Sequence, residues 1–352
     1  MTINAAIFGC SGPELTRGEA VFFRDCNPWA FILFARNIET PNQVRKLCID
    51  LRESVGRDAL IFVDQEGGRV QRFKPPHWRE APWAGKFGDL YELNQRAGLR
   101  AAWLNFRLIA HELKDMGVSA NCAPVLDLPV WGADPIISDR AFSCNPEIMI
   151  KLAHACMAGL TAGGVVPVIK HLPGHGRAKV DSHKALPIIE ESLETLINSD
   201  FIPFKAFMDA PMAMTAHVVL SAVDPHKPVT ISRHAMQSVI RGELGYQGLV
   251  MSDDLDMKAL KGGLTKLTEE TLKAGCDIVL QCSGKLPAMV QIAKGLKPLT
   301  GESMRRAELA WLMSEYAMDF DVQQGLSEYE NLMGILSASN KADKFSKMFG
   351  FS

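Results

Sequence analysis

The stretch LIFVDQEGGR (residues 60–69) shows the pattern that decides the fold, because an unbroken apolar run ends abruptly in charged side chains. A strand with one face in solvent alternates apolar and polar residues, whereas a parallel strand buried on both faces is apolar throughout. Eight short runs in the 352-residue chain have this apolar character. They cover residues 5–8, 30–34, 60–63, 119–122, 165–169, 212–215, 249–251 and 277–280. The sequence therefore predicts eight buried parallel strands.

Segments with helical periodicity lie between these runs. The clearest of them cover residues 41–55, 97–116, 146–162, 192–208, 233–245 and 264–274. Strands that alternate with helices build α/β folds with parallel sheets, and eight such units in order favour a closed barrel. We therefore predict an α/β protein that forms a single-domain (β/α)8 TIM-type barrel. An open doubly wound sheet is the alternative, and the number of strands disfavours it.

The barrel and its C-terminal extension divide the chain unequally. We expect the catalytic barrel to occupy residues 1–300, because the last strand-like run ends near residue 280. Residues 301–352 are predicted to form a helical segment and tail that packs on the barrel or trails from it. This segment contains one amphipathic helix, expected at residues 304–316, followed by a polar end. Residues 341–349 are expected to be loosely ordered.

Composition indicates a soluble globular protein, with 47% hydrophobic and 22% charged residues. The formal net charge of −2 provides no general attraction to nucleic acid or to an anionic membrane. No run approaches the roughly 18 apolar residues of a membrane span, and the N-terminus lacks the regions of a secretory signal. The eight cysteines include no C-x-x-C pair, so we expect reduced thiols. We expect a cytoplasmic monomer that binds neither nucleic acid nor a membrane.

The loop after the fifth apolar run contains a carboxylate and an imidazole at alternate positions, Asp181 and His183. In an extended segment, residues spaced i and i+2 project to the same side. A carboxylate beside an imidazole fixes the tautomer of the ring and favours its protonated form. The pair could therefore act as a general acid near neutral pH. The alternative is that Asp181 and His183 are a solvated pair of loop residues with no catalytic role.

Asp253 follows the seventh apolar run directly. A carboxylate at this position points into the mouth of a barrel, where it could attack an anomeric carbon as a nucleophile. The alternative for such an aspartate is to cap the next helix or to stabilise its dipole. We expect that second part for Asp254 or Asp256, and we assign the strand-end position to Asp253. For Asp127, a structural turn is at least as reasonable as a ligand contact.

Three basic residues also follow apolar runs or lie in nearby loops, namely Arg72, Arg140 and Lys170. Fixed Arg and Lys donors at a barrel mouth can form hydrogen bonds with several hydroxyl groups of a sugar. Ordinary surface ion pairing is the alternative for any one of them.

Four motifs together resemble the family 3 glycoside hydrolases. They are IFVDQEGGRVQRF (61–73), KHLPGHG (170–176), DSH (181–183) and MSDDLDM (251–257). The resemblance is strongest to the single-domain bacterial β-N-acetylglucosaminidases of peptidoglycan recycling. ILFARNI (32–38), APVLDLP (123–129) and SDRAF (138–142) extend it over roughly residues 5–285.

This resemblance implies a (β/α)8 barrel and a retaining, double-displacement mechanism without cofactor or metal. Carried over by position, Asp253 matches the nucleophile, His183 the acid/base and Asp181 its partner. The residues that would hold N-acetylglucosamine are Asp64, Arg72, Arg140, Lys170 and His171. The implied substrate is the saccharide N-acetylglucosamine β-1,4-linked to 1,6-anhydro-N-acetylmuramic acid, with or without its peptide. Because glycines flank His175 in the same loop, we expect this loop to close over the substrate.

Three rival interpretations arise from the residues alone, and the first two remain open. A phosphorylase could use the same residues, because a histidine acid/base does not repel an incoming phosphate. A zinc-dependent amidohydrolase could ligate its metal through histidines and a carboxylate. Its histidine ligands would be His171, His175, His183 and His217. A non-catalytic sugar-binding barrel would require that the nucleophile or the acid be absent, and both are present.

Overall fold

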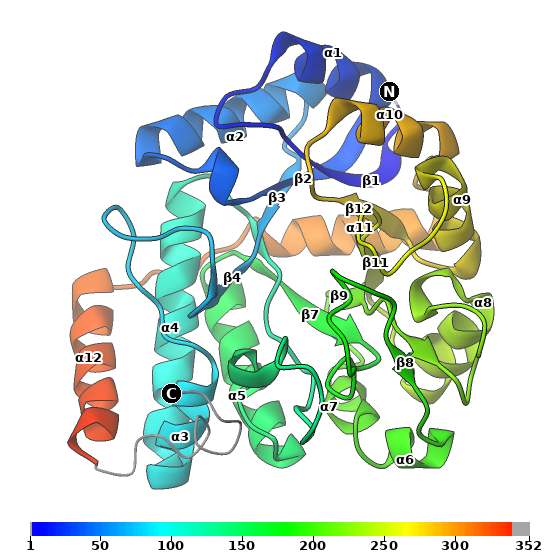
Figure 1. The fold of residues 1–352 in the computed structure, drawn as a ribbon. Helices are drawn as coiled ribbons and strands as arrows, with labels where there is room; N and C mark the ends of the chain where they lie inside the picture. Colours follow the sequence, from blue (N-terminus) through cyan, green and yellow to red (C-terminus); the bar gives the residue numbers. More distant parts are fainter. Residues whose placement is uncertain (1, 340–352) are drawn as a thin grey trace.

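Eight parallel strands close into a barrel in the computed structural model, which describes residues 2–339 (Figure 1). The predicted barrel is therefore confirmed, and each strand overlaps one of the expected apolar runs. The strands are β1 (Asn4–Gly9), β2 (Pro28–Leu33), β3 (Leu60–Val63), β6 (Ala120–Asn121), β7 (Val166–Leu172), β9 (Met212–Thr215), β11 (Leu249–Asp254) and β12 (Ile278–Gln281). The ring closes where β1 pairs with both β2 and β12.

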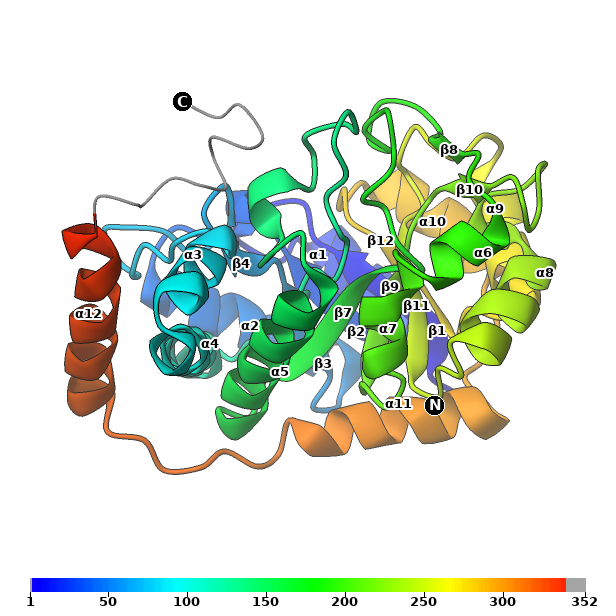
Figure 2. The same cartoon turned by 90° about the horizontal axis from the view of Figure 1, so that it is seen from below.

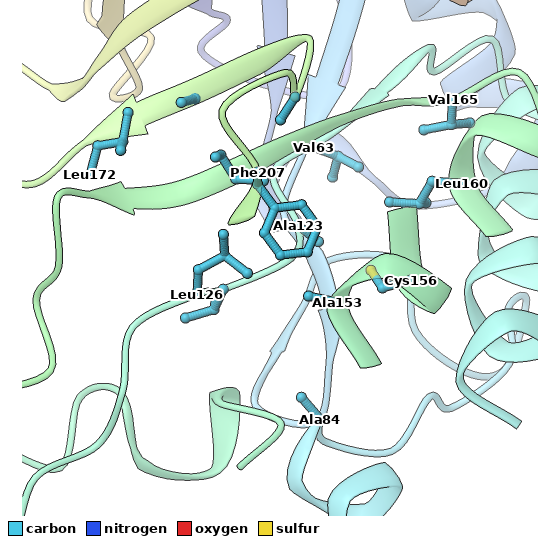
Figure 3. Packing of buried hydrophobic residues seen from close by; sticks show 14 of the residues in the cluster. Val63, Ala84, Ala123, Leu126, Ala153, Cys156, Leu160, Val165, Leu172 and Phe207 are labelled. Atoms are coloured by element: carbon cyan, nitrogen blue, oxygen red, sulfur yellow. The ribbon is translucent and has the colours of Figure 1, made fainter. Parts of the chain in front are cut away.

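Seven of the eight barrel strands contribute side chains to both of two hydrophobic clusters, and β6 contributes only Ala120, to one of them. Ile7 and Phe62 belong to the cluster that fills the barrel interior. Phe8 and Val63, their neighbours in the chain, belong to a cluster that also holds side chains from the surrounding helices. Figure 3 shows part of this outer cluster, including Ala153, Cys156 and Leu160 of α5 (Pro146–Ala162). Because both faces of the strands are buried, their sequences are mainly apolar, and the polar residues gather toward the carboxyl ends, as in β7 and β11.

Helices surround the barrel on its outer face. They are α1 (Arg17–Cys26), α2 (Pro41–Val55), α3 (Gly85–Leu93), α4 (Gln95–Asp115), α5 (Pro146–Ala162), α6 (Leu193–Ile197), α7 (Phe201–Ala206), α8 (Arg233–Ala235), α9 (Leu264–Ala274) and α10 (Leu286–Gly295). α8 continues as the π-helix η4 (Met236–Glu243). The 3-10 helices are η1 (Ala35–Asn37), η2 (Ser138–Arg140) and η3 (Val229–Ile231).

One expected helix, residues 192–208, is two helices in the structure. α6 ends at Ile197 and α7 begins at Phe201. Between them, the buried side chain of Asp200 accepts hydrogen bonds from Arg177 and from the hydroxyl of Ser199, each at 2.7 Å. This local polar contact interrupts a segment that periodicity alone predicted as continuous.

The C-terminal segment contains two helices. α11 (Gly301–Met313) lies across the end of the barrel opposite the short strands β8 (Ile188–Ile189) and β10 (Val219–Leu220) (Figure 2). Ala307 and Ala310 of α11 are buried in the interior cluster. α12 (Val322–Ala338) then packs on α4 and buries Tyr329. The expectation of a polar end after the first helix was wrong for these residues. The expectation for residues 341–349 lies outside the described part of the chain.

None of the helices within residues 2–339 combines the length and apolar character needed to cross a membrane. All eight cysteines are free, five of them buried and three partly buried.

Candidate active site

A cavity of about 270 Å³ opens at the carboxyl ends of the barrel strands. This volume is close to the lower end of pockets that hold small molecules, roughly 300–1,000 Å³. Seven of the eight predicted site residues line it, namely Asp64, Arg72, Arg140, Lys170, His171, His183 and Asp253. The eighth, Asp181, contacts the ring of His183. The structure therefore brings all of the predicted site residues together.

Asp253 is the penultimate residue of β11 and reaches the cavity from the barrel wall. Its Oδ1 accepts a hydrogen bond from the backbone N–H of Asp254 at 2.7 Å. Burial would raise the pKa of the Asp253 carboxyl, but the nearby imidazoles of His217 and His171 outweigh burial and lower it. The carboxyl is therefore an anion at neutral pH, which a nucleophile requires.

His183 and Asp181 form a hydrogen-bonded pair on the loop that follows β7. Asp181 Oδ1 accepts from the Nδ1 of His183 at 2.8 Å and from its backbone N–H at 2.9 Å. Burial would raise the pKa of Asp181, and these two hydrogen bonds lower it below its ordinary value. Because Nδ1 donates to a carboxylate, Nε2 is the nitrogen left to exchange a proton. The side chain of His183 is 62% exposed, so the ring stands in an open part of the cavity.

Backbone contacts hold this loop at both of its ends. At the start, Gly176 lies against the backbone of Leu128 so closely that a Cβ would overlap the carbonyl group. At the end, β8 pairs with β10 in parallel. Between these ends, Ala259 N–H donates to the carbonyl oxygen of Ser182 at 3.2 Å. The segment with His183 therefore spans two fixed points and rests on the loop after β11.

Two carboxylates and three cations form one network in the floor of the cavity. Lys170 Nζ lies 2.9 Å from Asp64 and 2.6 Å from Glu66. Arg72 donates to the other oxygen of Asp64 at 3.0 Å, and Arg140 binds both oxygens of Glu66 at 2.8 Å. Burial would raise the pKa of the Glu66 carboxyl, but Arg140 and Lys170 lower it to about 2. Glu66 is therefore charged at neutral pH, and the ion pairs orient all five groups relative to one another.

Glu66 is a site residue that the sequence analysis missed. It lies in β4 (Gln65–Gly67), which pairs with β5 (Val70–Gln71), and it is 5% exposed. A signal was available in the sequence, since Glu66 follows Asp64 at the i+2 spacing that places two side chains on one side of an extended segment. The same spacing had served to pair Asp181 with His183.

Asp127 orients His171 toward the cavity. Its Oδ2 lies 2.6 Å from His171 Nδ1, and its Oδ1 accepts from the backbone N–H groups of His171 and His175 at 3.2 and 2.7 Å. Asp127 is fully buried, and its pKa is lowered because these contacts outweigh the effect of burial. Asp127 thus has a structural role, which agrees with its interpretation as a turn residue. It also directly positions His171, a side chain that lines the cavity.

The prediction that Asp254 or Asp256 caps the next helix was wrong. The next helix, α9, has Gly263 at its N-cap. Asp254 Oδ1 instead accepts from the backbone N–H groups of Asp256 and Cys282, each at 3.1 Å. Burial raises the pKa of the Asp254 carboxyl to about 6. A carboxyl with this pKa lies beside Asp253, whose pKa is lowered.

His217, which the sequence analysis considered only as a possible zinc ligand, makes two polar contacts beside the cavity. Its Nε2 lies 3.0 Å from the backbone carbonyl oxygen of Asp254, and its Nδ1 lies 2.7 Å from the hydroxyl of Thr230. Since a carbonyl oxygen only accepts, Nε2 is the protonated nitrogen. Burial lowers the pKa of His217. Within residues 2–339, no three His, Cys, Asp or Glu residues are grouped so that they could hold a metal ion.

Comparison with known proteins gives the family of the chain. The model of the glycosyl hydrolase family 3 N-terminal domain matches residues 26–308. The chain belongs to glycosyl hydrolase family 3. It is therefore a glycoside hydrolase, as the motifs predicted.

Relatives in this family match nearly the full chain. A β-hexosaminidase of Xylella fastidiosa strain M23 is 35% identical over 319 residues, 90% of this chain and 92% of the relative. A β-hexosaminidase of Nitrosomonas eutropha is 37% identical over 287 residues, 80% of this chain and 82% of the relative. The structure of NagZ from Neisseria gonorrhoeae in complex with N-trifluoroacetyl-D-glucosamine superposes with a TM-score of 0.84 at 30% identity. That match covers 95% of this chain and 98% of the other.

Proposed function

We propose that the chain is a retaining exo-β-N-acetylglucosaminidase that removes terminal β-linked N-acetylglucosamine. One observation carries the proposal: the Asp253 carboxylate and the His183 ring, backed by Asp181, open onto the same cavity. The names of the similar proteins support the sugar, since two are β-hexosaminidases and the NagZ structure holds an N-acylated glucosamine.

The proposed substrate is N-acetylglucosamine β-1,4-linked to 1,6-anhydro-N-acetylmuramic acid, with or without its peptide. We assign the N-acetylglucosamine ring to the cavity floor, where Asp64, Arg72, Arg140, Lys170 and His171 present charged donors and acceptors. Carboxylates and guanidinium groups in fixed positions select sugar hydroxyls by geometry. We further propose that the protein acts in the cytoplasm, as a monomer, on fragments released during cell-wall recycling.

The reaction proceeds in two displacements. In the first, Asp253 attacks the anomeric carbon while the Nε2–H of the His183 imidazolium protonates the glycosidic oxygen. The bond to the leaving-group sugar breaks, and a covalent glycosyl-enzyme forms. In the second, the neutral Nε2 of His183 takes a proton from water, which attacks the same carbon and releases the sugar with its original configuration.

The proposed carboxylate partner of His183 has two effects in this scheme. Asp181 stabilises the imidazolium of the first step, and its contact with Nδ1 keeps Nε2 directed away from the loop backbone. We propose that the segment with His183 moves inward when substrate binds and outward when the product is released. This proposal is supported by the exposure of the His183 side chain, which is 62% exposed in this structure.

Mass spectrometry tests the central step. Incubation with a 5-fluoro-N-acetylglucosaminyl fluoride should leave one sugar on the peptide that contains Asp253, because the fluorine slows release of the intermediate. The variant Asp253→Ala should remain unlabelled, should retain the wild-type circular dichroism spectrum and should lose activity by several orders of magnitude. A label on any other residue would overturn the assignment of the nucleophile.

A further inference from the structure

A second hollow of about 230 Å³ lies in the loop between β6 and η2. Residues 129–135 form most of its wall, together with Ile137, Ser138 and Gly176. The side chain of Trp131 stands at this hollow and is 80% exposed. An indole ring left so open to water is unusual, because tryptophan is buried on average and its ring favours apolar contact.

The second hollow adjoins the catalytic cavity through a shared loop. Ile136 lines the catalytic cavity, whereas its neighbour Ile137 lines the second hollow. Gly176, which also lines the second hollow, belongs to the loop that carries His183. The two loops are joined where Asp134 N–H donates to the carbonyl oxygen of Ala178 at 2.8 Å. The hollow is therefore fixed between the first loop and the base of the acid/base loop.

The walls of this hollow suit a sugar ring. They are mostly apolar, with an aromatic ring on an open edge and one charged residue, Asp134. A pyranose has faces of C–H groups that pack on an aromatic plane and a rim of hydroxyls that donate to carboxylates. Nothing in the wall is basic, in contrast to the floor of the catalytic cavity, so the two spaces differ in the ligands that they favour.

We propose that this second hollow binds the leaving-group sugar of the substrate and that Trp131 is a specificity-determining residue. The inference rests on the proposed function, in which the scissile oxygen lies beside His183. When the non-reducing sugar occupies the catalytic cavity, the other sugar extends past His183 toward the walls that its loop helps to form. Trp131 then packs on the ring beyond the bond that breaks.

Two substrates that share the first sugar but differ in leaving group test this assignment. One is N,N′-diacetylchitobiose, whose leaving group is a complete sugar. The other is N-acetyl-β-glucosaminyl azide, whose leaving group is too small to reach Trp131. For the disaccharide, Trp131→Ala should lower kcat/KM about three- to tenfold, chiefly through KM, while kcat/KM for the azide stays within about twofold of wild type. Trp131→Phe should lie between the two enzymes.

Tyr316→Ala is the matched control, because Tyr316 is a 78% exposed aromatic residue next to α11, at the other end of the barrel. This variant should cleave both substrates as wild type does. An equal loss on both substrates in Trp131→Ala, or no loss on the disaccharide, would overturn the assignment of the second hollow. Failure of the wild-type enzyme to cleave either substrate would overturn the proposed function itself, and this result is distinct from the other two.

Discussion

The Nε2 atom of His217 lies 3.0 Å from the carbonyl oxygen of Asp254, the residue that follows the proposed nucleophile. The N–H of Asp254 in turn donates to the carboxylate of Asp253. A fully buried imidazole therefore holds the backbone of Asp254 on its carbonyl side, while the N–H on the other side of the same residue orients Asp253. We expect His217→Asn to lower kcat about tenfold or more with little change in KM, since the lost contact orients the nucleophile and leaves the sugar-binding groups in place.

His217→Gln is the informative companion variant. The amide nitrogen of Gln can reach the position of Nε2, whereas that of Asn reaches only the position of Nδ1. Steady-state kinetics should therefore give a higher kcat for His217→Gln than for His217→Asn. The reverse order would mean that the contact with Thr230, and not the one with Asp254, is what matters.

The proposed role of His183 as general acid predicts that the effect of its loss depends on the leaving group. His183→Ala should slow cleavage of a disaccharide far more than that of a dinitrophenyl glycoside, because a poor leaving group needs protonation most. Comparison of kcat/KM on the two substrates measures this. Lys184→Ala is the control on the same loop, since the Lys184 side chain is 78% exposed and lies 3.9 Å from Asp181. Equal losses on both substrates in His183→Ala would exclude His183 as the acid.

The buried ion pairs of Glu66 predict a strong effect on stability. Glu66→Gln leaves Lys170 and Arg140 with fewer partners in a buried site, so the free energy of unfolding should fall by about 3–5 kcal/mol in urea denaturation at neutral pH. The pKa of Glu66 is lowered from its ordinary 4.5 to about 2, so its stabilising contribution is present above pH 4.5. This contribution, and with it the difference between the two proteins, should shrink as the pH falls toward 2.

Glu302→Gln provides the contrast, because Glu302 and Arg305 form an ion pair that is exposed to solvent. This variant should unfold as wild type does at every pH. A Glu66→Gln protein as stable as wild type at neutral pH would show that Asp64 alone satisfies both cations.

Asp254 predicts a pH effect of opposite sign. Its pKa is raised from 3.8 to about 6, so folding favours the protonated carboxyl. Its stabilising contribution is complete below pH 3.8 and is lost as the pH rises through 6. Relative to Asp254→Asn, the wild-type protein should therefore lose unfolding free energy over this range, by at most about 3 kcal/mol because the carboxyl is partly open to the cavity. Urea titrations of both proteins at several pH values would test this. A difference in unfolding free energy that stays constant over this pH range would mean that the pKa of Asp254 is not raised.

Products formed in the presence of phosphate distinguish hydrolysis from phosphorolysis. The cations of the cavity, Arg69, Arg72, Arg140 and Lys170, each form an ion pair with a carboxylate. No cation that lines the described cavity is left unpaired for a phosphate ion, so free N-acetylglucosamine should be the product with or without phosphate. Detection of N-acetylglucosamine 1-phosphate by mass spectrometry would establish the phosphorylase alternative.

The barrel could be predicted from the sequence because burial on both faces leaves an unbroken apolar run at each strand. Elements without that signature were harder to place. α12 buries only a narrow stripe that includes Tyr329 and Leu336, so its sequence is mixed and was interpreted as a polar end. The break at Asp200 depends on Arg177, a residue from another loop, and periodicity within the segment carries no trace of it.

The site shows the same division. Residues at or directly after the ends of strands, such as Asp253 and Asp64, could be named because the barrel places strand ends around one opening. Glu66 was missed, since its pairing with Arg140 joins positions far apart in the chain. His217 was considered only as a possible zinc ligand, because its contact is with a backbone carbonyl group and no side-chain pattern records such a contact.

The pairing of β1 with β12 sets Ala6 beside Val279, so the first strand lacks one neighbour until most of the polypeptide has been synthesised. A nascent chain on the ribosome must therefore hold an open sheet with two unpaired edges, which are templates for aggregation. α11 is synthesised later still, and its Ala307 and Ala310 complete the hydrophobic cluster inside the barrel. A premature stop codon before β12 would leave a fragment unable to close, destined for chaperones or proteases even though every proposed catalytic residue is already present in it.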